Sequence, residues 1–369
     1  MDSTVGIFLH SFKGGGAERV AVTLANSFTE RGWRVQFIVQ TIDGPFRKLL
    51  DPHTDVFVLG GRQRWLPIRL GRYLRWHQPK AIISFMTEFN IIAIISAILS
   101  GWRGRLIVSE HTTMQETRVE LGSWRSWVLR GLMRLLYRRA DRVVAVSQQL
   151  ANDLVMQLDL PAQKVVAIPN PVPGEEIRRM SMVPVSHRFF SEGVPVLMAV
   201  GRLHSVKDYP TLVRAVADLR ERKDVRLIVL GEGPSRPELE ALVEALGMSE
   251  VVDFPGFVSQ PWPWMARVDV IAISSRGEGW PNVLAEALAL GVPVVATDCP
   301  TGPREILDNG RFGPLVPVGD IAAMSAALEY TLDDPPDREA LRRRAEEWSS
   351  GRVLQAYLSC INLRAQGTA

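Results

Sequence analysis

Residues 269–297 read DVIAISSRGEGWPNVLAEALALGVPVVAT. An apolar run, Asp269–Ile273, is followed by a glycine-containing loop, an Ala- and Leu-rich segment of helical length and a second apolar run, Val292–Thr297. Short apolar runs bounded by Gly, Pro or Asp are typical of buried strands. A strand joined to the next strand by a helix forms a parallel βαβ unit. This stretch therefore predicts a parallel sheet covered by helices.

The same alternation of apolar runs and helix-length segments extends through both halves of the chain. Ala17–Arg31 and Asp208–Arg222 are examples of the intervening helices. The other predicted strands are Val5–His10, Arg34–Gln40, Asp55–Leu59, Ala81–Phe85, Leu106–Ser109, Val143–Ser147, Val165–Ile168, Pro195–Val200, Val225–Leu230 and Val251–Phe254. Such a pattern favours parallel sheets with helices on both faces.

The pattern is interrupted at Pro169–Pro195, a stretch rich in Pro and Gly without a clear period, which we interpret as a linker. A chain of 369 residues suits two domains. The predicted fold is therefore α/β, with two Rossmann-like doubly wound domains, 1–172 and 173–350, facing a cleft. A helical C-terminal segment, 351–369, is expected to cross back to the first domain. In open α/β sheets ligands bind at the C-terminal ends of the strands.

Positive charge is concentrated in the first half, although the net charge is only +3. Neither 56–87 nor 123–140 contains an acidic residue, whereas both contain several arginines. Such segments attract nucleic acid, anionic lipid or phosphorylated substrates. Trp124–Arg138 has Arg130, Arg134 and Arg138 on one helical face with apolar residues beside them, which suits a helix lying on an anionic membrane. A core-packed helix with a solvated basic face fits equally well.

Cellular location is indicated by the cysteines and the apolar segments. Cys299 and Cys360 provide neither a disulfide framework nor a metal-binding spacing. The start, MDSTVGIFLH, does not resemble a signal peptide. Ile91–Leu99 is about half the length needed to cross a bilayer, and we interpret it as a buried helix. We expect a cytoplasmic protein, peripheral on the inner face of the cell membrane.

The loop Lys13–Glu18 follows the first predicted strand and opens a helix. Glycines there allow backbone to approach an anion at the helix start, although a plain tight turn explains them as well. The loop is a poor dinucleotide fingerprint, because Arg19 stands three positions after Gly16 and Asp43 comes too late after the second strand. An NAD-dependent oxidoreductase is therefore disfavoured.

A second candidate loop, Gly201–Lys207, follows the first strand of the second domain. It carries Arg202 and Lys207, two cations that suit a leaving diphosphate. The alternative is a solvated basic loop. No Asp-x-Asp pair or cluster with metal-ligand spacing occurs in the sequence. We therefore expect neither a metal nor another cofactor.

The third candidate is Glu278–Glu286, between a strand and a helix. Asn282 suits the N-cap, which would leave the Val283 and Leu284 amides as free donors for an anion. Glu286 has apolar neighbours, so it needs a partner if it faces inward; a surface position is the alternative. His111, after another strand, suits charge stabilisation, although a lone histidine often has no chemical role.

Six motifs in this order resemble those of the retaining glycosyltransferases of family 4 (glycosyl transferases group 1), which have the GT-B fold. The motifs are Gly15–Arg19, Tyr137–Asp141 followed by Val146–Ser147, Ile168–Pro171, Gly201–Leu203 with Lys207, Gly231–Pro234 and Glu278–Glu286. The last corresponds to the family's Glu-x7-Glu signature. Trp280 is a departure, because many members have a smaller aromatic residue or Leu there.

The resemblance implies a role for each matching residue. In the first domain, which would bind the acceptor, Gly15 and Gly16 approach the donor phosphate and His111 lies near the transferred sugar. In the second, which would bind the nucleotide sugar, Arg202 and Lys207 hold the diphosphate, Glu278 contacts the sugar and Glu286 the ribose. The implied catalytic residues are His111, Glu278, Arg202 and Lys207. The other implied donor contacts are Gly256, Phe257, Val258, Gly279, Trp280, Asn282, Val283 and Leu284.

The resemblance also implies an activity: transfer of a hexose or N-acetylhexosamine from a nucleoside-diphosphate sugar, by a front-face mechanism. Asp298–Ile306 is similar to members that use UDP-N-acetylhexosamines, so UDP is favoured. The expected acceptor is a growing saccharide or a polyprenyl-diphosphate-linked saccharide in bacterial glycan assembly, and no nucleic acid is expected as a partner. The alternatives are a GDP-mannose-dependent transferase and a non-catalytic subunit that binds sugar nucleotides.

Overall fold

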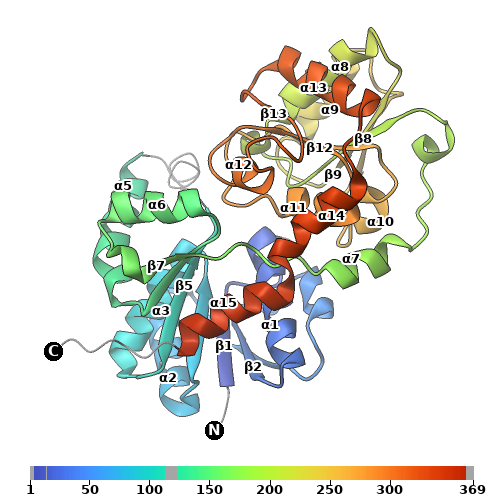
Figure 1. Ribbon diagram of the computed structural model, residues 1–369. Coiled ribbons are helices and arrows are strands. Elements are labelled where there is room, and N and C mark those ends of the chain that lie inside the picture. Colours follow the sequence, from blue (N-terminus) through green and yellow to red (C-terminus); the bar gives the residue numbers. More distant parts are fainter. Residues whose placement is uncertain (1–3, 14, 113–122, 363–369) are drawn as a thin grey trace. The chain divides into compact units, whose positions relative to one another are not determined.

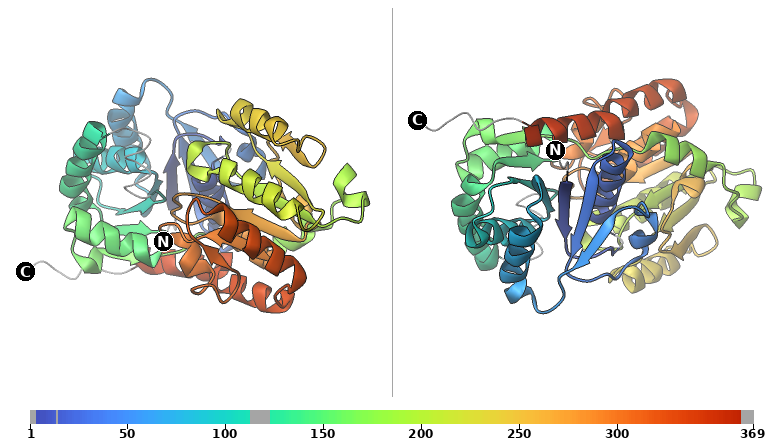
Figure 2. Two further views of the ribbon diagram at one scale, coloured as in Figure 1. Left: turned by 90° about the horizontal axis from the view of Figure 1, so that it is seen from above. Right: turned by 90° about the horizontal axis from the view of Figure 1, so that it is seen from below.

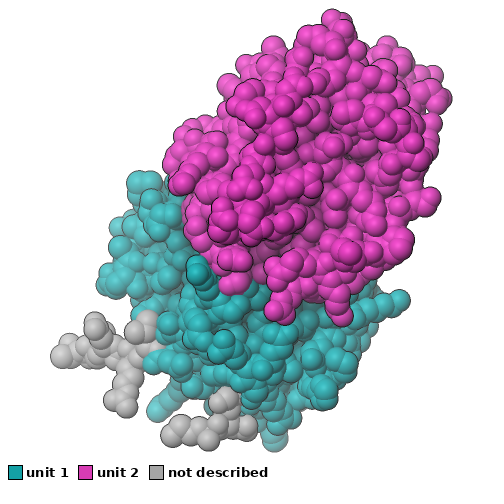
Figure 3. Space-filling model, turned by 45° about the vertical axis from the view of Figure 1, so that its right-hand side comes forward, with its two compact units in different colours: residues 1–171, 350–369 teal, residues 172–349 magenta. Residues whose placement is uncertain are grey.

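The computed structural model describes residues 4–13, 15–112 and 123–362, without the side chains of 123–125. The chain forms two compact units (Figure 3). Unit 1 comprises Met1–Pro171 and Ser350–Ala369, and unit 2 comprises Val172–Ser349. Each contains one parallel sheet with flanking helices (Figures 1 and 2), which confirms the predicted α/β class.

Unit 1 contains a seven-stranded sheet in the order β3-β2-β1-β4-β5-β6-β7. Its strands are β1 (Thr4–Leu9), β2 (Arg34–Val39), β3 (Asp55–Val58), β4 (Ala81–Phe85), β5 (Arg105–Glu110), β6 (Arg142–Ala145) and β7 (Val165–Ala167). Its helices include α1 (Gly16–Glu30), α2 (Leu66–His77), α3 (Thr87–Ser100), α5 (Ser123–Leu136), α6 (Gln148–Leu158) and α15 (Ser350–Asn362). The strand order reverses between β1 and β4.

Alternate side chains of the strands in unit 1 face two different helical layers, as the pleat requires. Ile7 and Leu9 of β1 belong to the same core as Leu24 of α1 and Tyr357 of α15. Phe8, between them in sequence, packs its ring 5.3 Å from that of Phe89 of α3. The last helix of the chain thus contributes to the core of unit 1.

Unit 2 contains a six-stranded sheet in the order β10-β9-β8-β11-β12-β13. Its strands are β8 (Val196–Val200), β9 (Arg226–Leu230), β10 (Val252–Gly256), β11 (Val270–Ile273), β12 (Val294–Thr297) and β13 (Leu315–Val316). Its helices are α7 (Gly174–Ser181), α8 (Tyr209–Arg220), α9 (Arg236–Ala245), α10 (Trp262–Met265), α11 (Asn282–Leu290), α12 (Gly302–Ile306), α13 (Ile321–Asp333) and α14 (Arg338–Ala345). The order reverses between β8 and β11.

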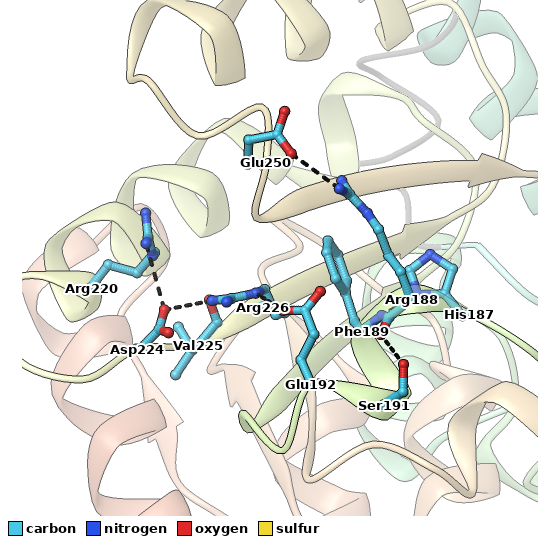
Figure 4. A network of polar contacts seen from close by, with 10 residues as sticks. All are labelled: His187, Arg188, Phe189, Ser191, Glu192, Arg220, Asp224, Val225, Arg226 and Glu250. Atoms are coloured by element: carbon cyan, nitrogen blue, oxygen red, sulfur yellow. Dashed lines mark hydrogen bonds and ion pairs between the residues drawn. The ribbon is translucent and has the colours of Figure 1, made fainter.

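The predicted linker Pro169–Pro195 is more structured than its composition indicates. It contains α7, whose buried Ile177 packs within unit 2, and a short 3-10 helix, Arg188–Ser191. Arg226 of β9 anchors the end of this segment by pairing with Glu192 at 2.6 Å and Asp224 at 2.5 Å (Figure 4). The segment therefore contains regular structure that its sequence did not reveal, because α7 has a single buried apolar residue and no readable period.

The interpretation of Ile91–Leu99 as a buried helix was correct only for its first part. The segment lies in α3, and Ile91–Ile94 are buried. Ile98 and Leu99, near the end of α3, are 53% and 63% exposed.

Candidate functional site

The candidate residues of unit 2 lie on loops that follow neighbouring strands of its sheet. Gly201–Lys207 follows β8, and the loop containing Glu278 follows β11. These two strands flank the point where the strand order reverses. In doubly wound sheets this switch point is where ligands bind. The structure thus places Lys207 and Glu278 at the position that the fold favours for a ligand.

Lys207 and Glu278 form an ion pair. The Lys207 Nζ lies 2.5 Å from Oε1 of Glu278, and the Ser275 hydroxyl donates to the same oxygen at 2.6 Å. The side chains of Lys207 and Glu278 are 25% and 10% exposed. Tyr209 is buried near them, and burial, reinforced by the Glu278 charge, raises its pKa. The two loops thus hold a partly exposed cation beside a largely buried carboxylate.

Backbone contacts fix the two loops to each other. The Ser274 hydroxyl donates to the Lys207 carbonyl at 2.7 Å, and the Arg276 amide donates to the Val206 carbonyl at 2.8 Å. The Arg276 guanidinium lies 2.9 Å from the buried carboxylate of Asp208. Since these contacts do not involve the Lys207–Glu278 pair, the loops keep their positions independently of it.

The loops after β8 and β9 approach too closely for side chains at their glycines. A Cβ on Gly231, where φ is 149°, would lie 1.9 Å from the Gly201 carbonyl oxygen. The Leu203 amide donates to the Glu232 carbonyl at 2.9 Å, which joins the loops further along. Arg202 is exposed on this surface.

The loop after β10 adjoins the loop after β9. Gly256 has a φ of 94° and accepts a hydrogen bond from the Gly231 amide at 2.8 Å. Phe257 is 48% exposed, and Val258 is half-buried. The predicted contacts to the nucleotide base therefore lie on the same edge of the sheet as the predicted diphosphate contacts.

Two expectations about the start of α11 were wrong. The N-cap is Pro281, so Asn282 is the first helical residue. The Leu284 amide is not a free donor, because it donates to the Pro281 carbonyl at 3.0 Å in a tight first turn. Asn282 and Val283 are half-buried at this end of the helix.

Glu286 lies one turn further along α11 and is 6% exposed, which excludes the surface position.

Trp280 is 5% exposed, and its ring packs edge-on against Trp348 at 5.2 Å. The Trp280 ring is therefore part of the packing of unit 2, and the Gly279 carbonyl beside it accepts from the Thr301 hydroxyl at 2.9 Å.

In unit 1, Gly15 is the N-cap of α1 and Gly16 is its first residue. A Cβ on Gly15 would lie 2.1 Å from Oε2 of Glu18, so this carboxylate lies against the glycine. Gly14 lies outside the described residues. An anion that approached Gly15 would have to displace the Glu18 side chain.

His111 follows β5 and is half-buried. Its Nε2 lies 3.0 Å from the Ser109 hydroxyl, and its ring centroid lies 5.4 Å from that of Phe85. Burial lowers the pKa of His111 to about 3. The imidazole is therefore neutral at pH 7 and suits hydrogen bonding rather than service as a cation.

Glu110, next to His111, is a buried carboxylate whose role the sequence did not reveal. It accepts hydrogen bonds from the hydroxyl of Tyr137, from Asn90 Nδ2 at 2.7 Å and from the Thr87 hydroxyl at 2.8 Å. Burial raises the pKa of Glu110, and the three donors oppose that rise. The sequence feature that could have revealed this residue is a carboxylate at the end of an apolar strand. The cluster joins β5 to α3 beside His111.

The arginines that repeat at every fourth position span two elements, because Arg130 and Arg134 lie in α5 and Arg138 lies in the 3-10 helix Tyr137–Arg139 that follows it. Arg134 and Arg138 both pair with Asp159, at 3.2 and 2.7 Å. The apolar residues beside them are exposed, with Trp127 and Leu135 both at 69%. The Trp124 side chain lies outside the described residues.

Metal-binding clusters and membrane-spanning helices are both absent from the described residues. No group of three or more His, Cys, Asp or Glu residues among them is placed to hold a metal ion. No helix within the described ranges has the length and apolarity needed to span a membrane.

Comparison with known proteins identifies both units. Residues 14–176 match the model of Glycosyltransferase Family 4, and residues 194–334 match that of Glycosyl transferases group 1. An N-acetylgalactosamine-N,N'-diacetylbacillosaminyl-diphospho-undecaprenol 4-alpha-N-acetylgalactosaminyltransferase of Campylobacter jejuni is 28% identical, with 93% of each chain covered. The lipopolysaccharide core biosynthesis glycosyltransferase LpsE of Rhizobium meliloti is also 28% identical, over 95% of this chain and 97% of its own.

The fold is similar to solved structures as well. Anabaena HepE in complex with UDP-glucose superposes with a TM-score of 0.80 at 20% identity, covering 96% of this chain and 98% of its own. The lipopolysaccharide outer core galactosyltransferase WaaB superposes with a TM-score of 0.73 at 19% identity, covering 97% and 99%. With both units matched and the parallel sheets in place, the chain belongs to glycosyltransferase family 4 and has the GT-B fold.

Proposed function

We propose that this glycosyltransferase moves a hexose or N-acetylhexosamine, with retention of configuration, from a nucleoside-diphosphate sugar to a growing or polyprenyl-diphosphate-linked saccharide. UDP is the favoured donor nucleotide. Bacterial glycan assembly is the favoured setting, since the C. jejuni and R. meliloti relatives are named for such transfers. The structure of HepE, which was solved in complex with UDP-glucose, supports UDP.

The observation that carries this proposal is the Lys207–Glu278 pair at the switch point of unit 2. A diphosphate would attract the Lys207 ammonium, and the hydroxyls of the transferred sugar would donate to the Glu278 carboxylate. The pair therefore keeps a cation next to a hydrogen-bond acceptor. A nucleoside-diphosphate sugar requires this arrangement, because its charged diphosphate is attached to a neutral sugar. Arg202, exposed on the same loop, supplies a second cation.

The proposed reaction is front-face displacement. The acceptor oxygen bonds to the anomeric carbon on the side from which the phosphate leaves, and the leaving phosphate oxygen takes the acceptor proton. Arg202 and Lys207 stabilise the negative charge of that phosphate without a metal ion. The neutral His111 donates a hydrogen bond near the sugar, and Glu286 binds the ribose hydroxyls. Gly15, Gly16 and the loop Gly256–Val258 contact the rest of the donor.

We also propose that the protein binds to the inner face of the cell membrane as a peripheral protein. The exposed Trp127, Val128, Leu132 and Leu135 of α5 form an apolar face. Arg130 adds positive charge next to it. Insertion of apolar side chains, assisted by attraction to anionic lipid, is the usual binding mode of such helices.

Activity assays of purified protein test the proposal. UDP, GDP and ADP sugars are offered with a set of saccharide acceptors, and products are identified by mass spectrometry and anomeric NMR. Lys207→Ala and Glu286→Ala are expected to abolish transfer without unfolding the protein. Lys223→Ala, which removes a surface lysine paired with Asp333, is the matched control.

Four outcomes contradict parts of the proposal. Full activity of both site variants excludes the assigned site. A strict metal requirement in EDTA-treated samples excludes the metal-free mechanism. Binding of UDP without turnover of any acceptor favours the non-catalytic alternative, and turnover with GDP-mannose alone excludes UDP.

A further inference from the structure

Unit 1 contains a shallow cavity of about 380 Å³, widely open to solvent, between α2, α3 and α5. Pro67, Ile91, Ile92 and Leu129 give it an apolar wall. Its volume lies within the range of about 300–1,000 Å³ that is typical of small-molecule sites. The cavity can therefore hold several carbon atoms of an apolar ligand.

The cavity lies on the edge of the sheet where ligands are expected. α3 begins at Thr87, directly after the C-terminal end of β4, and Glu88 in its first turn borders the cavity. His111 follows the C-terminal end of β5, the strand beside β4. The cavity therefore shares an edge of unit 1 with the proposed catalytic histidine.

Polar residues border the cavity on one side. Gln63 Nε2 donates to Glu88 Oε2 at 3.0 Å, so an amide holds the carboxylate of the lining. Arg64 is exposed, and its guanidinium carbon lies 5.8 Å from the centroid of the Trp65 ring. Among the lining residues that the structure describes, Arg64 is the only cation, and Glu88, bound by Gln63, is the only carboxylate. An apolar cavity bordered by an exposed guanidinium suits a ligand with a hydrocarbon tail and an anionic head.

We propose that this cavity binds the isoprene units next to the diphosphate of a polyprenyl-diphosphate-linked acceptor, with Arg64 contacting the diphosphate. The inference rests on the proposed function, because it concerns the acceptor of that same reaction. It adds a site for the lipid part of the acceptor, separate from the donor contacts in unit 2.

The limited volume gives the proposal a measurable signature. Burying each methylene group strengthens binding roughly fourfold. Affinity should therefore rise with prenyl length while carbons enter the cavity and then level off. Attraction to the head group alone would give no dependence on length.

The first experiment uses calorimetry on the full-length protein with soluble probes below their micelle concentrations. Inorganic diphosphate, geranyl diphosphate, farnesyl diphosphate and geranylgeranyl diphosphate are compared. We expect at least tenfold tighter binding of farnesyl diphosphate than of inorganic diphosphate, with a plateau at longer chains. Equal affinities overturn the proposal. Equal or tighter binding of dihexanoyl phosphatidylglycerol also overturns it, because the cavity would then accept membrane lipid.

The second experiment fills the cavity by mutation. Ile92→Trp places an indole in it, and Ile98→Trp, on the same helix but 53% exposed, is the matched control. We expect at least a tenfold loss of farnesyl diphosphate affinity in Ile92→Trp and no change in Ile98→Trp. Thermal unfolding and UDP binding report whether each variant is folded. If Ile92→Trp does not fold, Leu129→Trp fills the same cavity from α5. Unchanged affinity in a folded cavity variant overturns the proposal.

Transfer assays separate this inference from the proposed function. A lipid-linked acceptor and a water-soluble acceptor with the same glycan are compared in wild-type protein and Ile92→Trp. A selective rise in KM for the lipid-linked acceptor supports the cavity. Equal effects on both acceptors contradict it, even though transfer itself is then shown. If wild type uses neither acceptor, the proposed function fails, and the farnesyl diphosphate measurement still decides the cavity.

Discussion

The ammonium group of Lys207 and the carboxylate of Glu278 meet at 2.5 Å, although they come from loops on opposite sides of a strand-order reversal. Removal of one partner leaves the other desolvated and unpaired, which costs more than removal of both. We expect Glu278→Gln to lower the free energy of unfolding by about 1–3 kcal/mol. The double variant Lys207→Met/Glu278→Gln should lose less. Urea denaturation of the wild type, of Lys207→Met, of Glu278→Gln and of the double variant measures the coupling free energy between the two side chains. Additive losses would show that the pair contributes nothing to stability.

Gly231 permits the close approach of the loops after β8 and β9. Gly231→Ala should destabilise unit 2 by about 2 kcal/mol or more, since its Cβ meets the Gly201 carbonyl and its φ is unfavourable for alanine. It should also weaken UDP binding, because the loop after β8 carries the proposed diphosphate contacts. Gly351→Ala, which meets no atom within 4 Å, is the control. Thermal unfolding and calorimetry measure both effects, and wild-type values for Gly231→Ala contradict the packing argument.

His111 should make the protein sensitive to acid. Its pKa is about 3 in the folded protein, below the ordinary value of 6.5, so the unfolded chain binds a proton first as pH falls. Stability from this group is complete above about pH 6.5 and is lost as pH falls toward 3, by at most about 1.4 kcal/mol per pH unit. Urea midpoints from pH 3.5 to 7.5 should show a smaller acid loss in His111→Gln. Parallel profiles for the two proteins exclude this role.

The hydrogen bond from Tyr137 to Glu110 should have the opposite dependence on pH. Because the folded pKa of Glu110 is raised, its burial costs stability as pH rises above about 4.5, and Tyr137 offsets part of that cost. Tyr137→Phe should therefore destabilise the protein by about 1–3 kcal/mol at pH 8 and by much less at pH 4.5. Tyr330→Phe, at an exposed tyrosine that donates to Asp334, is the control. A loss independent of pH would assign the effect of Tyr137→Phe to packing.

The exposed apolar residues of α5 should decide binding to vesicles. Trp127→Ser/Leu135→Ser should reduce co-sedimentation with phosphatidylglycerol vesicles several-fold, because apolar insertion is lost. Wild-type binding should weaken with salt, since attraction between exposed charges is screened. Tyr330→Ser, in unit 2, is the control. Unchanged binding of the double variant would exclude α5 as the contact. Arg130→Glu is a better probe of charge than changes at Arg134 or Arg138, which pair with Asp159.

The sequence predicted the parts of the fold that depend on local apolar pattern. Ala81–Phe85 has the predicted bounds because it is a short apolar run with clear flanking residues. β13 was missed since Leu315–Val316 is only two residues long and is defined by pairing with β12. Proximity of Lys207 to Glu278 followed from the rule for switch points, but their direct pairing depends on side-chain positions in two distant loops. The pairing of Asp159 with Arg134 of α5 and with Arg138 of the following 3-10 helix likewise joins separate elements and leaves no local pattern.

The core of unit 1 is complete only when α15 packs against it. Leu354 and Tyr357 of α15 belong to the same core as strand residues near the N-terminus, while all of unit 2 lies between them in sequence. During translation, the whole of unit 2 emerges from the ribosome before α15 does. The core of unit 1 therefore stays incomplete until α15 has been synthesised, and a message truncated before the codon for Ser350 yields a protein whose sheet in unit 1 lacks this helix.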